Sequence, residues 1–106
     1  MRRGEVWWVD FEPAVGGEAQ KIRPAIIASN EASNRHSNRL QVVPVTSNVG
    51  KLHPGEAFVR LKGSQRKAQA NLLTTVSKLR VSSKIDALSN TDLEAVESAI
   101  RTQLGL

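Results

Sequence analysis

The chain has 106 residues and carries 15 Lys and Arg against 10 Asp and Glu, which gives a net charge of +5. This length is typical of one domain around one hydrophobic core, so we expect residues 1–106 to form a single domain. The sequence has no cysteine, which excludes disulfides and thiolate metal sites, and it has no apolar run long enough for a membrane span or a signal peptide. This composition suits a cytoplasmic protein.

The positive charge is concentrated in the second half of the chain. The stretch from residue 60 to 84 has no acidic residue and contains seven basic ones, which are Arg60, Lys62, Arg66, Lys67, Lys78, Arg80 and Lys84. Positive charge gathered on one face is the electrostatic footprint of a polyanion partner such as a nucleic acid. Charge alone fits an ordinary solvated surface equally well.

In chain order, the first half reads as strands separated by polar loops. Val6–Phe11 is β-branched and aromatic, which predicts a strand, whereas Glu12–Ile22 contains a proline and two glycines, which predict a loop. Ala25–Ser29 is an apolar run and predicts a strand buried on both faces. Asn30–Asn38 is polar and rich in turn-forming residues, so we expect at most one helical turn there.

The strands continue beyond residue 40. Leu40–Thr46 predicts a third strand, in which Pro44 cannot donate to a ladder and is expected at an edge or a bulge. Glu56–Leu61 predicts a fourth strand and Lys62–Lys67 a basic turn. Gln69–Val81 predicts one bent strand or two short ones. Strands and helices do not alternate, which argues against a parallel sheet.

The C-terminal segment has helical periodicity. Ser89 or Thr91 is suited to cap its start and Gly105 follows its end, and the apolar positions at helical spacing are Leu93, Val96, Ile100 and Leu104. Five or six short strands followed by one helix predict a mainly β (α+β) fold. The expected architecture is a small, strongly bent antiparallel barrel with a C-terminal helix.

Several kinds of catalytic site are not supported by the sequence. His36 and His53 both lie in polar loops, and a two-histidine nuclease would need them at one site. The carboxylates are scattered singly, whereas metal-dependent hydrolysis needs clustered hard ligands. We therefore expect neither a metal nor another cofactor.

Two short stretches carry side chains suited to phosphate chemistry. Arg23 precedes Pro24, and a residue before proline is pushed into extended geometry, so the guanidinium is aimed by the sheet. A charged guanidinium matches phosphate in a bidentate way. Thr46, Ser47 and Asn48 end a predicted strand and are able to donate to phosphate oxygens or hold a 2′-hydroxyl. Taken singly, the same residues fit a surface ion pair and ordinary turn-formers.

The motifs occur together in a specific order. Arg3 to Trp7 reads RGEVW, Lys21 to Pro24 fits KxRP, and Pro44 to Ser47 fits PxTS. In this order and spacing they resemble the MazF/PemK (Kid-like) family of toxin endoribonucleases from toxin–antitoxin modules, and the resemblance covers nearly the whole chain. It implies a small SH3-like barrel, a homodimer, metal-independent cleavage of single-stranded RNA, and inhibition by a cognate MazE-like antitoxin.

The resemblance also implies roles for individual residues. The family's catalytic arginine falls on Arg23 and its catalytic threonine on Thr46. The positions expected to contact RNA are Glu18, Lys21, Pro24, Ser47, Asn48, Gln69 and Asn71. The chain departs from the family in two places: Gln69-x-Asn71 stands where some members have Arg-x-Asp, and Thr74–Lys78 stands where many have Arg-Thr-Ile-Asp-Lys. These departures are expected to change the RNA sequence that is recognised.

The implied reaction uses the 2′-hydroxyl of the RNA as nucleophile and leaves a 2′,3′-cyclic phosphate and a 5′-hydroxyl. Arg23 would stabilise charge rather than carry protons, because guanidinium has a pKa above ~12. Two alternatives remain at this point. One is a non-catalytic nucleic-acid-binding barrel, which would need exposed stacking aromatics. The other is a toxin of the same fold that poisons a protein such as gyrase and has no need of Arg23 and Thr46.

Overall fold

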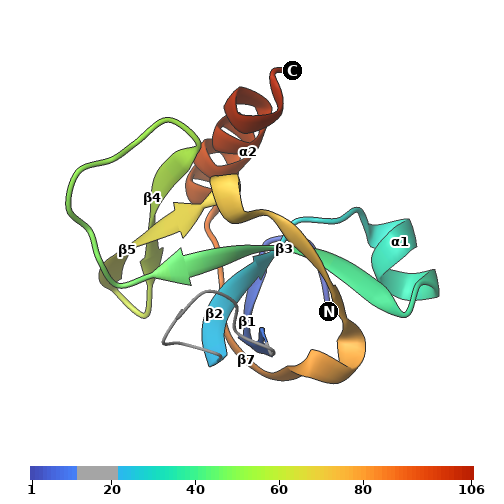
Figure 1. The fold of residues 1–106 in the computed structure, drawn as a ribbon. Helices are drawn as coiled ribbons and strands as arrows, with labels where there is room; N and C mark the ends of the chain where they lie inside the picture. The colour runs from blue at the N-terminus through green and yellow to red at the C-terminus, as the bar shows by residue number, and fades with distance from the viewer. Residues whose placement is uncertain (12–21) are drawn as a thin grey trace.

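The structure of the chain is a computed structural model, in which residues 1–11 and 22–106 are described (Figure 1). Its strands are β1 (Glu5–Asp10), β2 (Ile22–Ile27), β3 (Arg39–Thr46), β4 (Glu56–Leu61), β5 (Ser64–Gln69), β6 (Thr74–Ser77) and β7 (Val81–Ala87). The helices are α1 (Glu31–His36) and α2 (Asn90–Leu104), with 3-10 turns η1 (Ala70–Leu72) and η2 (Lys78–Arg80). All paired strands are antiparallel, in the order β4-β5-β3-β2-β1-β7, with β6 also beside β3.

Strand β3 changes its neighbour along its length. Its first half, Arg39 to Val42, pairs with β6, whereas Val45 and Thr46 pair with β5. Pro44 falls between these two ladders and has Ala25 of β2 opposite it on the other side. The missing amide of proline is tolerated in this gap. β3 is thus an interior strand. Of the two positions predicted for Pro44, an edge or a bulge, the edge is wrong, and the proline lies at an interruption between two ladders.

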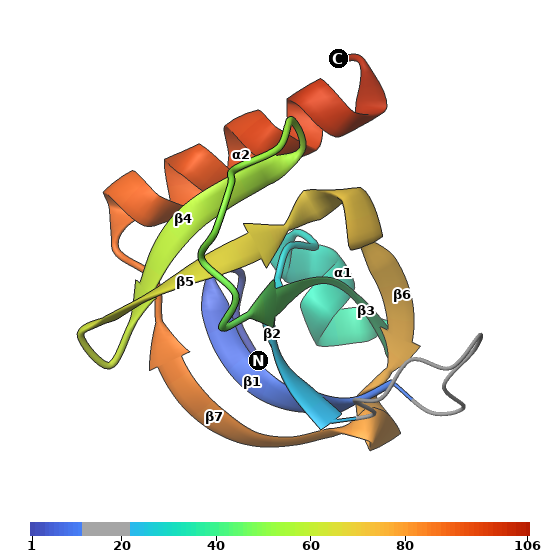
Figure 2. The same cartoon turned by 60° about the vertical axis from the view of Figure 1, so that its left-hand side comes forward.

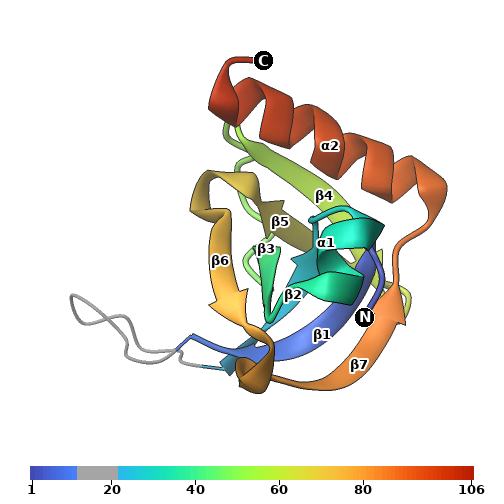
Figure 3. The ribbon, with the colours of Figure 1, turned by 90° about the vertical axis from the view of Figure 1, so that its right-hand side faces the viewer.

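The sheet curls so that each of its faces packs a separate core. One core contains Ile26 and is covered by Val96 and Ala99 of α2, which lies across β4 (Figure 3). The other core is enclosed by the ring that β1, β2, β3, β6 and β7 form (Figure 2), and it contains Ala25 and Ile27. Successive residues of β2 therefore enter different cores. This confirms the predicted burial of that strand on both faces.

Several predicted elements have different limits in the structure. β2 begins at Ile22 rather than Ala25, so Arg23 and Pro24 lie inside the strand. α1 has six residues, more than the single turn expected, and Asn30 caps it by accepting from the amide of Ser33 at 2.8 Å. The buried side chain of Asn34 anchors α1 by donating to the carbonyl of Ser29 at 2.9 Å. Local capping and this buried amide sustain a helix that polar composition alone does not indicate.

The predicted basic turn over residues 62–67 is wrong for most of its length. Leu61 pairs with Ser64, and only Lys62 and Gly63 form the turn, with φ of 49° and 80°. Positive φ at both central residues is the type I′ geometry that suits a two-residue hairpin. β5 therefore begins at Ser64, inside the segment predicted to be a turn.

The region after β5 also differs from the prediction. Gln69–Val81 contains η1, β6 and η2 rather than only one or two strands. β7 was not predicted, and it raises the number of strands in the described residues from the expected five or six to seven. Its three consecutive residues Ser82, Ser83 and Lys84 are exposed, so no apolar alternation marks it.

The predicted limits of the C-terminal helix are confirmed. The Ser89 hydroxyl accepts from the amide of Asp92 at 3.1 Å, and Gly105 ends α2 with φ of 72°. Val96 and Ala99 are buried on its inner face. Leu104, expected in the core, is 56% exposed because the helix runs past the edge of the sheet there.

The RGEVW segment ties the start of β1 to the end of β2, to α2 and to the loop between β7 and α2. The Arg3 side chain donates to the carbonyl of Ala28 at 3.1 Å and pairs with Glu97 of α2 at 2.5 Å. Gly4, with φ of 88°, donates to the carbonyl of Ile27 and accepts from the amide of Leu88. These residues therefore have structural roles in this chain.

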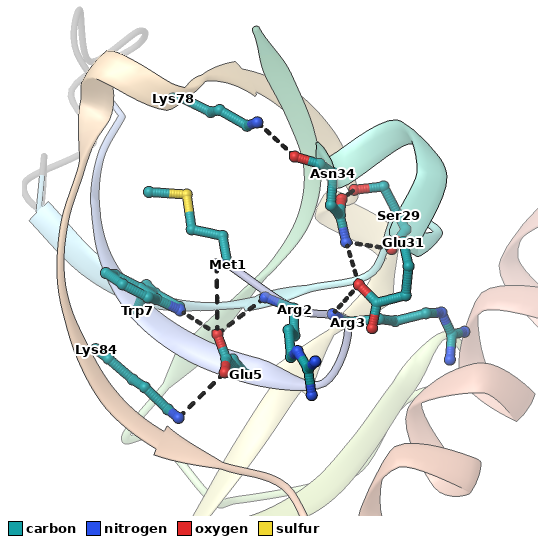
Figure 4. A network of polar contacts seen from close by, with 10 residues as sticks. All are labelled: Met1, Arg2, Arg3, Glu5, Trp7, Ser29, Glu31, Asn34, Lys78 and Lys84. Carbon is teal, nitrogen blue, oxygen red and sulfur yellow. Dashed lines mark hydrogen bonds and ion pairs between the residues drawn. The ribbon is translucent and has the colours of Figure 1, made fainter. Parts of the chain in front are cut away.

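Glu5 is the centre of a polar network in the same segment. One carboxylate oxygen accepts from the amide of Arg2 at 2.9 Å and from the indole of Trp7 at 3.0 Å, and the other lies 3.1 Å from the ammonium of Lys84 (Figure 4). Burial alone would raise the pKa of Glu5, but these hydrogen bonds and the Lys84 charge lower the pKa to about 2. The carboxylate thus links β1 to β7 in its charged form.

We expect Glu5 to make the protein sensitive to acid. Because its pKa is lower when folded, its contribution to stability is complete above pH 4.5 and is lost as the pH falls toward about 2. In Glu5→Gln the free energy of unfolding should depend less on pH across that window. Urea unfolding at a series of pH values measures this, with Glu94→Gln on the exposed side of α2 as the control. Equal pH dependence in parent and Glu5→Gln would contradict the account.

Candidate functional site

Arg23 and Thr46 lie on neighbouring strands. The β2–β3 ladder pairs Ala25 with Pro44. Arg23 lies two residues before Ala25 and Thr46 two residues after Pro44, so both lie just beyond the same end of this ladder. On its other side, Thr46 pairs with Lys67 of β5. The curled sheet thus brings together the two residues that the resemblance marks as catalytic.

The Arg23 side chain is directed across β3. Arg23 is extended within β2, opposite Val9 of β1, and half-buried. Its Nη2 donates to Oε1 of Gln69 at the end of β5, so the guanidinium spans the strand that carries Thr46. The structure therefore brings Gln69, expected to contact RNA, against the expected catalytic arginine.

The turn after β3 holds the Thr46 hydroxyl in place. The amide of Asn48 donates to Oγ1 of Thr46 at 3.2 Å, and the amide of Gly50 donates to Oδ1 of Asn48 at 3.1 Å. The hydroxyl of Thr46 therefore still has its own proton to donate, and the Asn48 amide still has its N–H donors. Thr46 and Asn48 can therefore stabilise the turn as acceptors and still donate hydrogen bonds to a phosphate.

A pocket of about 480 Å³ opens beside this turn. Its wall contains Thr46, predicted to be catalytic, and Pro24 and Ser47, predicted to contact RNA, but not Arg23, Asn48 or Gln69. Its wall also includes Trp8 and Arg66, together with Ile22 and Val45. Sequence reasoning did not select Trp8 or Arg66. Trp7 and Trp8 are adjacent in a predicted strand, and alternation along a strand directs their side chains to opposite faces. This pattern could have indicated that one of the two is exposed.

The remaining expected site residues lie elsewhere or outside the described structure. Asn71 lies on η1, where its amide donates to the carbonyl of Gly55 at 3.1 Å, and the described wall of the pocket does not include it. Glu18 and Lys21 fall in 12–21, outside the described residues.

The seven basic residues from 60 to 84 do not all lie free on one face. Lys67 is buried and pairs with Glu56 at 3.1 Å, and it donates to the carbonyl of Lys51 at 3.0 Å. Lys78 donates to the backbone carbonyl of Asn34, and Lys84 pairs with Glu5. Arg66 is the member of this set that lines the pocket. The expectation of a single basic face therefore does not apply to the buried Lys67.

The buried carboxylate of Glu56 remains charged beside Lys67. Burial would raise its pKa, but hydrogen bonds from the amide of His53 and from Lys67, together with the positive charge of Lys67, hold the pKa below its ordinary value. The pair fixes the loop before β4 to β5. It belongs to the scaffold that carries the turn after Thr46.

Other chemistries find little support in the described structure. Within residues 1–11 and 22–106, no three His, Asp or Glu side chains are grouped so as to hold a metal ion. His36 ends α1 and His53 precedes β4, and these two segments lie on opposite sides of Figure 1. None of the helices in these two ranges is long and apolar enough to cross a membrane.

The family of the chain follows from its sequence. A family model described as PemK-like, MazF-like toxin of type II toxin-antitoxin system matches residues 2–104. The chain therefore belongs to this toxin family. It is 36% identical over 115 residues to Endoribonuclease MazF9 of Mycobacterium tuberculosis, an alignment that covers 100% of this chain and 98% of the relative. It is 30% identical over 112 residues to Endoribonuclease MazF of Staphylococcus saprophyticus, covering 100% and 92% of the two chains.

Solved structures confirm the predicted fold. The crystal structure of MazF from Deinococcus radiodurans matches with a TM-score of 0.85 and 24% identity, covering 100% of this chain and 97% of that one. A mycobacterial endoribonuclease in complex with its cognate antitoxin matches with a TM-score of 0.84 and 21% identity, covering 100% and 96%. The mainly β architecture with a C-terminal helix is thus that of MazF toxins.

The Lys67–Glu56 pair gives a prediction about stability. Both side chains are nearly enclosed, at 7% and 6% exposed, so Lys67→Met leaves a buried carboxylate without its partner. Removing one member of a buried ion pair costs about 3–5 kcal/mol. We expect a loss of that order in urea unfolding. Lys62→Met, at the exposed hairpin turn, is the matched control, and equal stability of the two variants would contradict the assignment.

Proposed function

We propose that the chain is a metal-independent endoribonuclease toxin that cleaves single-stranded RNA, including mRNA, and thereby inhibits translation. The observation that carries the proposal is that Arg23, which donates to Gln69 across β3, lies at the same end of the β2–β3 ladder as Thr46. Membership of the toxin family and the endoribonuclease names of its relatives support RNA as the substrate. Residues 1–106 would form a single toxin domain. The protein would act in the cytoplasm, where mRNA is translated.

The proposed reaction needs no group beyond the protein and the RNA. The 2′-oxygen attacks the adjacent phosphorus, the bond from phosphorus to the 5′-oxygen breaks, and the products are a 2′,3′-cyclic phosphate and a 5′-hydroxyl. The 2′-hydroxyl loses its proton and the leaving 5′-oxygen gains one. The Arg23 guanidinium stabilises the charge that develops on the phosphate oxygens, because a preorganised cation loses little energy to reorganisation. The Thr46 hydroxyl donates a second hydrogen bond to the same group.

The neighbouring residues would hold the RNA strand. Ser47 and the amide of Asn48 offer donors next to Thr46, and Pro24 provides an apolar surface in the same pocket. Glu18 and Lys21 would border the groove, and Asn71 would contact a more distant part of the strand. The departures at Gln69 and Asn71 would alter which bases are preferred.

A cognate MazE-like antitoxin is the proposed inhibitor. Solved complexes of similar toxins support it, among them MazE-MazF from Deinococcus radiodurans. The net charge of +5 favours an acidic partner segment that competes with RNA for the same surface. A flexible acidic chain would order itself on binding.

Incubation with single-stranded RNA in the presence of EDTA tests the proposed function. Cleavage with 2′,3′-cyclic phosphate and 5′-hydroxyl ends supports it. Binding without cleavage favours a non-catalytic barrel, and neither binding nor cleavage favours a toxin with a protein target.

We propose that the protein is a homodimer, although not for the reason that the sequence suggested. The apolar strands of residues 25–29 and 40–46 are covered within one chain, so they do not require a second copy. Exposed leucines instead occur near the junction of η1, the loop before β4 and the end of α2, namely Leu52, Leu72 and Leu104. A second copy would cover this surface.

Sedimentation at micromolar concentration should show a dimer rather than the 11.6 kDa monomer. Leu52→Glu places a charge in the exposed leucine surface and should shift the equilibrium toward monomer. Leu79→Glu is the control, because Leu79 is 97% exposed on η2, away from that junction. A parent protein that stays monomeric would refute the proposal.

Variants of the two catalytic residues test the mechanism. Arg23→Ala should stay folded and lose about 10²–10³ in cleavage rate or more, the size seen when one preorganised donor is removed. Arg23→Lys should also be slow, because a point charge does not reproduce the bidentate guanidinium. Thr46→Val keeps the shape and removes the hydroxyl, so the rate should fall at nearly constant stability.

Single-turnover cleavage, affinity for an uncleavable 2′-deoxy oligonucleotide and melting temperature separate the possible causes. Affinity should fall much less than rate, since the proposed contacts act in the transition state. If Arg23→Ala and Thr46→Val cut RNA at nearly the parent rate while folded, the catalytic assignment is wrong.

A further inference from the structure

Trp8 presents a large apolar surface in the pocket beside Thr46. Its side chain is 40% exposed, and its cross-strand partner is Pro24. Ile22, in the same wall, is 60% exposed. The adjacent Trp7 is only partly exposed and its indole donates to Glu5, so its role is structural. No such hydrogen bond in the described residues occupies the Trp8 indole, and Trp8 is one of the residues that line the pocket.

Arg66 forms the polar side of this pocket. It lies on β5 and is half-buried, and its Nη1 donates to the carbonyl of Gln65 at 3.0 Å. A guanidinium carries five N–H donors, so this bond leaves several available. No carboxylate in the described parts of the chain forms a salt bridge with Arg66. Its charge is therefore not neutralised within the described structure.

The chemistry of the wall is that of a nucleobase site. An aromatic ring next to Ile22 and Pro24 offers a flat apolar platform, and every base has a π face that stacks on such a ring. Arg66 and the hydroxyl of Ser47 add hydrogen-bond donors at the edge. A base that presents two acceptors side by side matches a guanidinium, and guanine does so with O6 and N7.

We propose that this pocket, which adjoins Thr46, binds one unpaired base of the substrate strand, with the base stacked on Trp8 and its acceptor edge on Arg66. The inference rests on the proposed function and extends it, because it assigns part of the RNA sequence preference to two residues outside the catalytic pair. Thr46 lies in the wall of the same pocket whereas Arg23 does not, so a base held there belongs to a nucleotide close to the Thr46 side of the cut. This continuity favours RNA over a peptide as the occupant.

Cleavage of a randomised single-stranded RNA pool, followed by sequencing of the cut ends, tests the base preference. The parent should prefer guanine at one position beside the cut. Arg66→Gln should lose that preference and keep the preferences at other positions. Arg101→Gln removes one charge from the exposed end of α2 and should leave the whole pattern unchanged.

Affinity for an oligonucleotide with a 2′-deoxy nucleotide at the cleavage position tests the stacking. Trp8→Ala should weaken binding about ten- to hundredfold, the usual range for one lost base–aromatic contact. Trp8→Phe keeps a ring and should bind within a few-fold of the parent. Melting temperatures establish that each variant is folded, and the exposed position of Trp8 favours this.

The possible outcomes separate this inference from the proposed function. If Trp8→Ala and Arg66→Gln keep the parent's affinity and base preference while Arg23→Ala abolishes cleavage, the base site is refuted and the endoribonuclease stands. If the parent cuts no RNA, the proposed function fails. The affinity measurements then decide about the pocket alone: a loss in Trp8→Ala supports the base site and no loss refutes it. If Trp8→Ala binds an acidic peptide more weakly than the parent does but binds RNA equally well, the pocket belongs to a protein partner and the base site is refuted.

Discussion

The change of neighbour along β3 is the constraint on which the site depends. A strand that stayed beside one partner would form a flatter sheet, and β5 and β6 would compete for the same edge. Because β3 pairs with β6 through Val42 and with β5 from Val45, the sheet curls at Pro44. This curl allows a side chain from β2 to reach the end of β5 across β3, as Arg23 does to Gln69. A proline, which has no amide to pair, is compatible with the gap between the ladders.

Much of the fold could be predicted from local patterns in the sequence. The limits of β4 and α2 followed from an apolar strand and from Ser89 and Gly105 as caps. β7 could not be predicted, because its residues Ser82 to Lys84 are polar and exposed, and its formation depends on pairing with β1 far away in the chain. The start of β5 was missed for a related reason, since Lys67 is charged and becomes buried only through its partner Glu56.

For the candidate site, the sequence identified the two catalytic residues but not the side chains around them. The motifs named Arg23 and Thr46, and the extended geometry of Arg23 followed from Pro24 alone. The contact with Gln69 and the pocket with Trp8 and Arg66 involve strands that sequence patterns do not place side by side. The RGEVW motif was a marker of the family rather than of a site. In the structure, its Arg3 and Glu5 tie β1 to α2 and β7.

The pairing of β1 with β7 has a consequence for how the protein is made. β1 pairs with β2 on one side and with β7 on the other. The second ladder, in which Val6 pairs with Asp86, forms only after residues 81 to 87 have been synthesised. Contacts so distant in sequence form late and slowly, because the intervening chain must lose its freedom before they are gained. During synthesis the growing chain therefore holds Arg23 and Thr46 long before the barrel can close around its second core. A nucleolytic toxin with this topology would gain its activity late, after most of the chain has left the ribosome.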